Sequence, residues 1–476
     1  MTASPGDRRV DSNTGVKGLI KAGAGRTEIT PPVGIAHAGW GAAVHEKAEG
    51  VDMPFYATAL YLESPETRAV IVDLDILLLP DWLDKDIRKA VGAAAGVAPD
   101  HVWLSATHTH AGAEFPGTFL KGGAELIEPY LAGVPAQAAA AAREAKRRAR
   151  AVNIGTGAGV CGINVNRRPV TPDGFMFTGR NWKGFVDNQV LVTALDDTSG
   201  KPVATIVNFA CHPTILGPAN RQLSPDYPGH ARRTVEENIG GLCLFLQGAA
   251  GNQGPIITFV GDIEAPRKLG KRLGLEAARV RLEIDPVRRK ERLVEIVGSG
   301  ADLGMYVDEP AGEPDQTLRV VNTVVNLPAG EFPPVAEIEA EFDRLMARLQ
   351  AVRQTGDEKA IKAAVMASKR AWIRRNLARM AQSDPIKVHL QAIRLGDTAL
   401  IGVPGEPFAE IGMDVKRRSP APHTVFCGYT NGLFAYIPTA QAYEEGGYEV
   451  RTTPFKAGAD RDLSDACVTA IGALWK

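Results

Sequence analysis

Short apolar runs alternate with longer amphipathic stretches through most of this chain. Runs rich in β-branched residues predict buried strands, and they lie at 57–62, 69–73, 102–106, 190–195, 203–210 and 242–246. Stretches with apolar residues at helical spacing predict helices, and these lie at 83–93, 124–151, 229–238 and 263–278. This alternation predicts an α/β fold in which helices cover a mixed β-sheet core.

The segment 334–381 differs in character from the rest of the chain. It is helical in pattern and rich in charge, and its only glycine is Gly356. A segment of this kind has few positions that would end a helix. It therefore predicts a helical hairpin that is inserted into the sheet domain and set off from it.

The two ends of the chain carry weaker signals. Residues 1–18 are polar and lack an apolar segment, which predicts a disordered leader and neither a signal peptide nor an anchor. The remainder, 19–476, is expected to form a single domain. Its last segment, 464–476, has helical spacing, and Ser464 is the expected N-cap.

Two histidines follow one of the predicted strands. His108 and His110 come directly after 102–106. In an extended chain, side chains two residues apart point the same way, so the two imidazoles would share one face. Such a pair suits a zinc site, or one metal ligand beside a general acid or base. The alternative is a polar strand end with two solvated histidines.

Other strand ends also carry polar side chains. His212 stands where a strand breaks at Pro213, Glu406 lies between a strand and a helix, and the turn 428–436 carries tyrosines. Each of these has an ordinary structural role on its own, as a hydrogen-bonded group, a helix-terminal acid or a packing aromatic. Together with the histidine pair they supply enough imidazoles and carboxylate for a zinc site with one open position.

Composition narrows the possible partners. The chain has 54 Lys and Arg against 55 Asp and Glu, so its net charge favours neither nucleic acid nor an anionic membrane. Its five cysteines are scattered without a C-x-x-C pair, which argues against a disulfide framework or a thiolate zinc site. We expect a cytoplasmic protein with a small-molecule substrate and no stable membrane association. The sequence leaves the oligomeric state open.

Several motifs, taken together, resemble the neutral/alkaline non-lysosomal ceramidase family. They stand in that family's order along nearly the whole chain: GAGRTEITPP at 23–32, THTHAG at 107–112, NVNRRP at 164–169, HPT at 212–214, PGE at 404–406, and the closing segment 431–448. The resemblance implies the fold of the family's catalytic domain, here without the additional carboxyl-terminal β-sandwich domain of its secreted members.

The same resemblance implies a single zinc ion and a set of site residues. Two histidines, a glutamate and a tyrosine would hold the metal, namely His108, His212, Glu406 and Tyr436. Three further residues would surround the reacting carbonyl, namely His110, Arg167 and Tyr448. In this chemistry zinc acidifies water and polarises the carbonyl, a histidine carries a proton to the leaving amine, and Arg and Tyr donate hydrogen bonds.

The turn 248–253 departs from the family pattern. The family has a Gly-Asp-Val-Ser-Pro-Asn-like turn, whereas this chain reads GAAGNQ. The missing serine and aspartate put contacts to a ceramide headgroup in doubt, and the loop 167–182, dense in Arg and aromatic residues, could bind a polar or anionic molecule instead. We therefore expect attack on the carbonyl of an N-acyl amide that is a soluble substrate rather than membrane ceramide.

Two other functions stay open at this point. The first is a zinc hydrolase of an ester, lactone or glycosidic bond, because the same zinc chemistry serves those bonds. The second is a non-catalytic binding protein on the same fold. Retention of all the expected ligands argues against the second.

Overall fold

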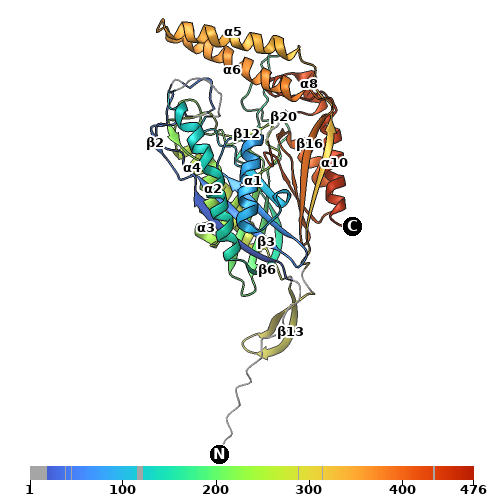
Figure 1. Cartoon of the computed structure of the whole chain (residues 1–476). Coiled ribbons are helices and arrows are strands. Elements are labelled where there is room, and N and C mark those ends of the chain that lie inside the picture. The colour runs from blue at the N-terminus through green and yellow to red at the C-terminus, as the bar shows by residue number, and fades with distance from the viewer. Residues whose placement is uncertain are drawn as a thin grey trace, which may run out of the picture.

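The computed structural model describes residues 19–476, except 38, 44, 115–121, 288, 313–314 and 433–434. The expected leader, 1–18, lies outside the described residues. Two β-sheets pack face to face, and helices cover their outer faces (Figure 1). The α/β class is confirmed, with the difference that the core contains two sheets rather than one.

The larger sheet has eight strands in the order β11-β9-β8-β6-β1-β3-β4-β5. Only two neighbouring pairs, β4 with β5 and β9 with β11, run parallel, so the sheet is mixed. In chain order its strands are β1 (Lys21–Glu28), β3 (Tyr56–Glu63), β4 (Arg68–Leu74), β5 (Val102–Ala106), β6 (Arg150–Val160), β8 (Gln189–Asp197), β9 (Pro202–Phe209) and β11 (Leu242–Gln247).

This sheet folds back on itself, so that its edge strand β11 contacts β4 and β5 at the other edge. The backbone N–H of Phe245 donates to Asp73 Oδ2 at 2.9 Å across this junction. Arg232 braces the same place, with ion pairs of 2.6 Å to Asp73 and 2.5 Å to Asp75. As a result the carboxyl ends of β5 and β9 lie close together, although their strands are far apart in the sheet order.

The smaller sheet has the order β15-β16-β17-β19, with bounds Leu318–Leu327, Ile386–Leu395, Thr398–Gly402 and His423–Cys427. One of its faces packs on the larger sheet through buried side chains such as Trp103, Ile393 and Val425. Its strands β16 and β17 follow each other along the chain and pair as an antiparallel hairpin. Close packing between the sheets fixes the position of the loops at their shared end.

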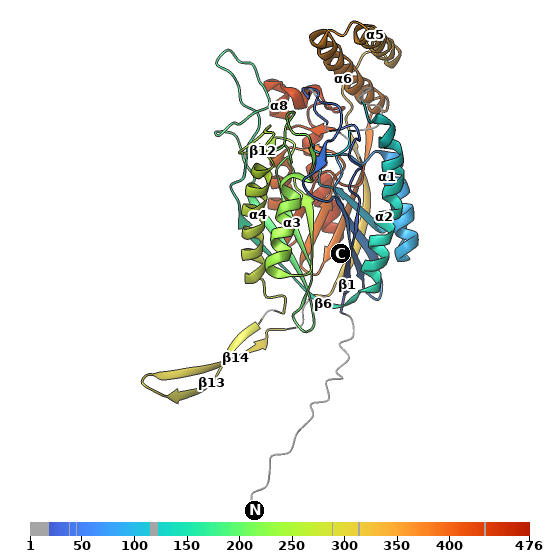
Figure 2. The same ribbon diagram turned by 90° about the vertical axis from the view of Figure 1, so that its left-hand side faces the viewer.

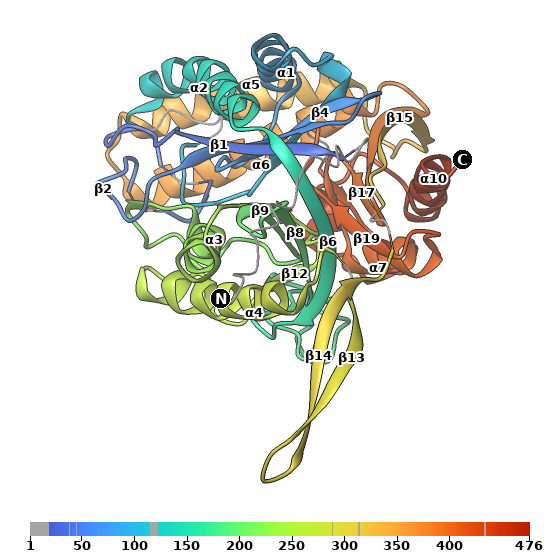
Figure 3. The ribbon, with the colours of Figure 1, turned by 90° about the horizontal axis from the view of Figure 1, so that it is seen from below.

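Helices cover the outer faces in pairs (Figure 3). The pairs are α1 (Asp81–Ala95) with α2 (Ile127–Arg147), α3 (Asp226–Ile239) with α4 (Glu264–Glu283), and α7 (Ala409–Arg418) with α10 (Ala459–Ala473). Several predicted helix bounds are wrong by a few residues. The helix expected to reach 151 ends at Arg147, because the chain already pairs in β6 from Arg150. The last helix begins at Ala459, so Ser464 is buried inside it rather than at its N-cap.

Two excursions leave this body at opposite ends (Figure 2). The predicted hairpin at 334–381 is confirmed as α5 (Val335–Arg353) and α6 (Glu358–Met380). The second excursion is a two-stranded arm, β13 (Arg289–Gly298) with β14 (Asp302–Pro310), whose side chains are almost all exposed. No helix within the described ranges combines the length and apolarity needed to cross a bilayer.

Candidate metal and substrate site

The two best-placed histidines come from the two strand ends that the folded sheet brings together. His108 follows β5 with a positive φ of 66°, and its Nδ1 lies 2.7 Å from the carbonyl of Leu77. His212 follows β9, and its Nδ1 lies 2.7 Å from the carbonyl of Ala250. Because a carbonyl can only accept, each Nδ1 is the protonated nitrogen. Each Nε2 therefore turns a lone pair into the site.

A carboxylate completes this arrangement. Glu406 Oε2 lies 3.1 Å from His212 Nε2 and 3.7 Å from His108 Nε2. Glu406 starts β18 (Glu406–Pro407), which pairs in parallel with β20 (Tyr436–Ile437) and sets Glu406 opposite Tyr436. The Tyr436 ring stacks on the His212 ring with centroids 6.3 Å apart. The four expected ligand residues thus gather in one place.

The histidines are held in the form that binds metals. Burial lowers the pKa of His108 to about 4. The pKa values of His110 and His212 are also lowered, chiefly by burial. These imidazoles are therefore neutral near pH 7 and keep the lone pairs that a metal needs. The residues present fit zinc, which prefers imidazole nitrogen and carboxylate oxygen.

His110 is a third histidine that lies next to His108 and His212. Its Nε2 lies 3.2 Å from His108 Nε2, and ligand atoms of His108, His110 and His212 all lie within 4.8 Å of one another. Its buried Nδ1 has no hydrogen-bond partner among the described residues. The Trp40 ring lies against it, with centroids 5.0 Å apart. This geometry allows His110 either to bind a metal or to exchange a proton.

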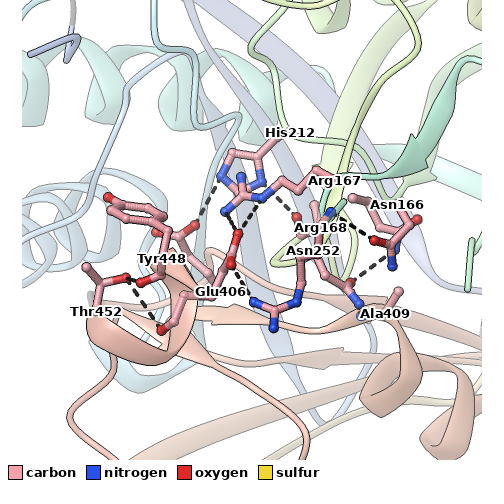
Figure 4. Close-up of polar contacts among 12 residues, drawn as sticks. Asn166, Arg167, Arg168, His212, Asn252, Glu406, Ala409, Tyr448 and Thr452 are labelled. Carbon is pink, nitrogen blue, oxygen red and sulfur yellow. Dashed lines mark hydrogen bonds and ion pairs between the residues drawn. The ribbon is translucent and has the colours of Figure 1, made fainter. Parts of the chain in front are cut away.

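Arg167 is fixed by a glutamate that the sequence analysis missed. Its Nε donates to Glu449 Oε1 at 3.0 Å, and Arg168 Nη1 donates to Glu449 Oε2 at 2.6 Å. Burial alone would raise the pKa of Glu449, but the charges of the two arginines outweigh it and lower that pKa. The guanidinium of Arg167 lies 5.1 Å above the ring of Tyr436. Figure 4 shows Arg167 in one cluster with His212, Glu406 and Tyr448.

The loop 167–182 differs from its expected role. Its first two arginines are committed to Glu449, and Arg180 donates to the carbonyl of Ile256 at 3.1 Å. Of its aromatic residues, Phe175 lines the site, whereas Trp182 is 69% exposed. The loop therefore brings one buried cation, Arg167, and one apolar side chain, Phe175, to the cleft, not an array of free arginines.

Tyr429 is a second residue whose position the sequence did not reveal. Its hydroxyl lies 3.4 Å from Glu406 Oε2 and 3.3 Å from His212 Nδ1. Its carbonyl accepts from the N–H of Ala106, so the loop after β19 continues the edge of β5. Its ring centroid is 4.5 Å from that of His108. Tyrosines in this turn were expected to pack, and Tyr429 does so directly against the expected ligands.

The turn 248–253, which departs from the family pattern, supports the site through its backbone. The carbonyl of Asn252 accepts from the N–H of Arg167 at 2.9 Å, and the carbonyl of Gln253 accepts from the N–H of His212 at 3.0 Å. Backbone groups do not require a serine or an aspartate. The departure in sequence thus leaves this scaffolding role intact.

A cleft of about 980 Å³ opens from these residues. We call the side that holds the expected site residues the floor, which consists of the cleft-lining His110, Arg167, His212, Tyr436 and Tyr448 together with His108 and Glu406, which contact His212. Aromatic side chains from several loops line the space above it, namely Trp40, Phe175, Phe259 and Phe332. The opposite side is formed by α6, which we call the wall. The space is large enough for a small molecule with an apolar portion.

Comparisons with known proteins agree with this architecture. Residues 20–248 match the family described as neutral/alkaline non-lysosomal ceramidase, N-terminal. The crystal structure of neutral ceramidase from Pseudomonas aeruginosa is similar over 96% of this chain and 75% of that chain, with 18% identity and a TM-score of 0.68. A ceramidase complexed with C2 is similar over 96% and 76%, with 18% identity and a TM-score of 0.67. The fold implied by the resemblance is confirmed.

Proposed function

Since this chain belongs to the neutral/alkaline non-lysosomal ceramidase family, we propose that it is a zinc-dependent hydrolase of N-acyl amides. The observation that carries the proposal is the convergence of two anchored, neutral imidazoles on one carboxylate, with Glu406 Oε2 at 3.1 and 3.7 Å from the two Nε2 atoms. We further propose that the substrate is a soluble amide rather than membrane ceramide.

In this proposal His108, His212, Glu406 and Tyr436 hold the metal. Bound zinc would supply Lewis acidity, which polarises a carbonyl and lowers the pKa of water. The carbonyls of Leu77 and Ala250 fix the tautomers of the two histidines, and such anchoring strengthens imidazole ligands. Burial raises the pKa of Tyr436, so this tyrosine is a weaker partner than the imidazoles.

The remaining floor residues act on the substrate. In amide hydrolysis, water adds to the carbonyl carbon, the C–N bond breaks and the leaving nitrogen takes up a proton. His110 carries that proton, because its ring faces the cleft and Nδ1 has no partner within the described part of the chain. Arg167, held by Glu449, and Tyr448 donate hydrogen bonds to the carbonyl oxygen as charge develops there.

Metal analysis combined with activity tests this assignment. The purified protein should contain about one zinc per chain, cleave an N-acyl amide and lose that activity when a chelator removes the zinc. His108→Ala and His212→Ala should lose both metal and activity, whereas His110→Ala should keep the metal and lose activity. His423→Ala, a histidine outside the cleft, is the matched control. Full zinc content in the first two variants would contradict the ligand assignment.

A further inference from the structure

The wall of the cleft comes from the inserted hairpin. Its lining side chains are Met366, Lys369, Arg370, Ile373 and Arg374 of α6. Their spacing of three to four residues places them on one helix face. Figure 1 shows the hairpin extending from the body. One face of its helix α6 also lines the cleft that opens from the floor.

This wall is strongly cationic. It contributes Lys369, Arg370 and Arg374, and Arg451 of α9 (Tyr448–Arg451) adds a fourth positive charge beside the floor. Among the described residues that line the cleft, Glu331 is the only acidic one. The cleft thus carries a local excess of positive charge in a chain whose formal net charge is −1, and such a field favours anions.

Two of the four cations are already engaged. Lys369 Nζ donates to the carbonyl of Gly39 at 2.7 Å. Arg374 Nη1 lies 3.1 Å from Glu341 Oε2 of α5. The guanidinium groups of Arg370 and Arg451, by contrast, are exposed and have no hydrogen bond or ion pair with any other residue that the structure describes. These two guanidinium groups are free to bind a ligand.

We propose that the substrate is an N-acyl amide whose amine portion carries an anionic group, and that Arg370 and Arg451 bind this group. The inference rests on the proposed function and names the substrate of the same site. A guanidinium binds a carboxylate or phosphate through paired N–H donors. The aromatic residues of the cleft contact the acyl chain, while Arg370 and Arg451 bind the anionic group of the amine portion. An N-acylated amino acid has both features.

A pair of probes that differ in one charge tests the inference. N-dodecanoylglycine is anionic, and N-dodecanoylglycinamide is its neutral counterpart. We expect the wild-type protein to favour the anionic probe by about tenfold or more in kcat/KM and in Kd measured by calorimetry. Arg370→Gln and Arg451→Gln should reduce this preference about tenfold, mainly through KM. N-dodecanoyl-2-aminoethyl phosphate distinguishes phosphate from carboxylate recognition.

Arg348→Gln is the matched control, because Arg348 is an exposed arginine of α5 outside the cleft lining. It should leave the preference unchanged. Equal kcat/KM and Kd for the two probes, or equal losses for both in the variants, would overturn the inference. If neither probe is cleaved, the proposed amide hydrolysis fails, and the calorimetric preference still decides whether the wall recognises an anion.

Discussion

The floor and the wall of the cleft are built by opposite means. The floor takes its proposed metal ligands from strand ends, and they are buried and anchored, as the hydrogen bonds of His108 and His212 to backbone carbonyls show. The wall is a face of an inserted helix, and its arginines are exposed. In the proposed function, the sheets determine the reaction, whereas an insertion determines which molecule reaches it. Changes on the wall should therefore alter selectivity and leave the metal in place.

The largest effect is expected at the carboxylate of the floor. Glu406→Gln keeps the shape of the side chain but removes the negative charge that faces both Nε2 atoms. We expect zinc content to fall and kcat/KM to drop about a thousandfold or more for both probes. Metal analysis and amide hydrolysis measure this, with the exposed Glu444→Gln as control. Full zinc content in Glu406→Gln would remove the distinction between floor and wall.

The next largest effect is expected at Glu449, which holds Arg167 of the floor in place. Glu449→Gln breaks a buried ion pair with Arg167 and Arg168, so the free energy of unfolding should fall by about 3–5 kcal/mol. Activity should fall about tenfold to a hundredfold, because Arg167 loses its orientation. Glu445→Gln, which removes a half-exposed pair with Arg168, should cost under about 1 kcal/mol.

The pH dependence of this pair has a definite sign. Because the folded state lowers the pKa of Glu449 below its ordinary 4.5, its ionisation stabilises the fold above that pH, and the stabilisation is lost as the pH falls. Urea unfolding at pH 7 and at pH 4 should show the difference between wild type and Glu449→Gln shrinking with acid. A difference that grows on acidification would contradict the assigned pair.

The positions of several floor residues could be expected from sequence because they lie at strand ends, whereas the full set of expected ligands came from the family resemblance. His108, His212 and Glu406 each follow a strand or its break, and strand ends of one domain converge at the edge of a sheet. Glu449 could not be found this way, because it meets Arg167 across 282 residues of chain. Nothing in its neighbourhood marks it as buried. Such a contact depends on how the two sheets pack, which periodicity does not encode.

The turn 248–253 teaches a related lesson. The absence of the family's serine and aspartate from this turn bears on contacts with the substrate. Its glycines, in contrast, allow close packing. A Cβ on Gly251 would lie 2.3 Å from the carbonyl oxygen of Glu406, a distance that no side chain tolerates. The turn therefore brings the backbone of the site together, and this requirement appears only when the packed neighbour is known.

The wall was predictable as a structure but not as a part of the site. Charge and helical pattern predicted the hairpin at 334–381, and α5 and α6 confirm it. Apolar residues are spread around α6 rather than concentrated in one stripe, so its sequence does not reveal which face is turned inward. Only the fold shows that the face with Arg370 lines the cleft.

Charge reversal on the wall should change selectivity more than neutralisation does. Arg370→Glu replaces a free cation with an anion on the cleft-lining face of α6. We expect kcat/KM for N-dodecanoylglycine to fall about tenfold below that of Arg370→Gln, while the cationic probe N-dodecanoylethylenediamine gains. Zinc content should stay at the wild-type level, and Arg348→Glu is the control. Loss of zinc in Arg370→Glu would show that wall and floor are coupled.

The smallest expected effect is that of salt concentration, which distinguishes the floor from the exposed arginines in the wild-type protein. Salt screens exposed charges strongly, because the Debye length falls from about 10 Å at 0.1 M to about 3 Å at 1 M. Raising sodium chloride over this range should reduce the preference for the anionic probe several-fold, because Arg370 and Arg451 are exposed. Buried groups are screened much less, so zinc content and turnover of the neutral probe should stay nearly constant. A preference that survives high salt would place the recognition of the anion on the buried floor, at Arg167, and not at Arg370 and Arg451.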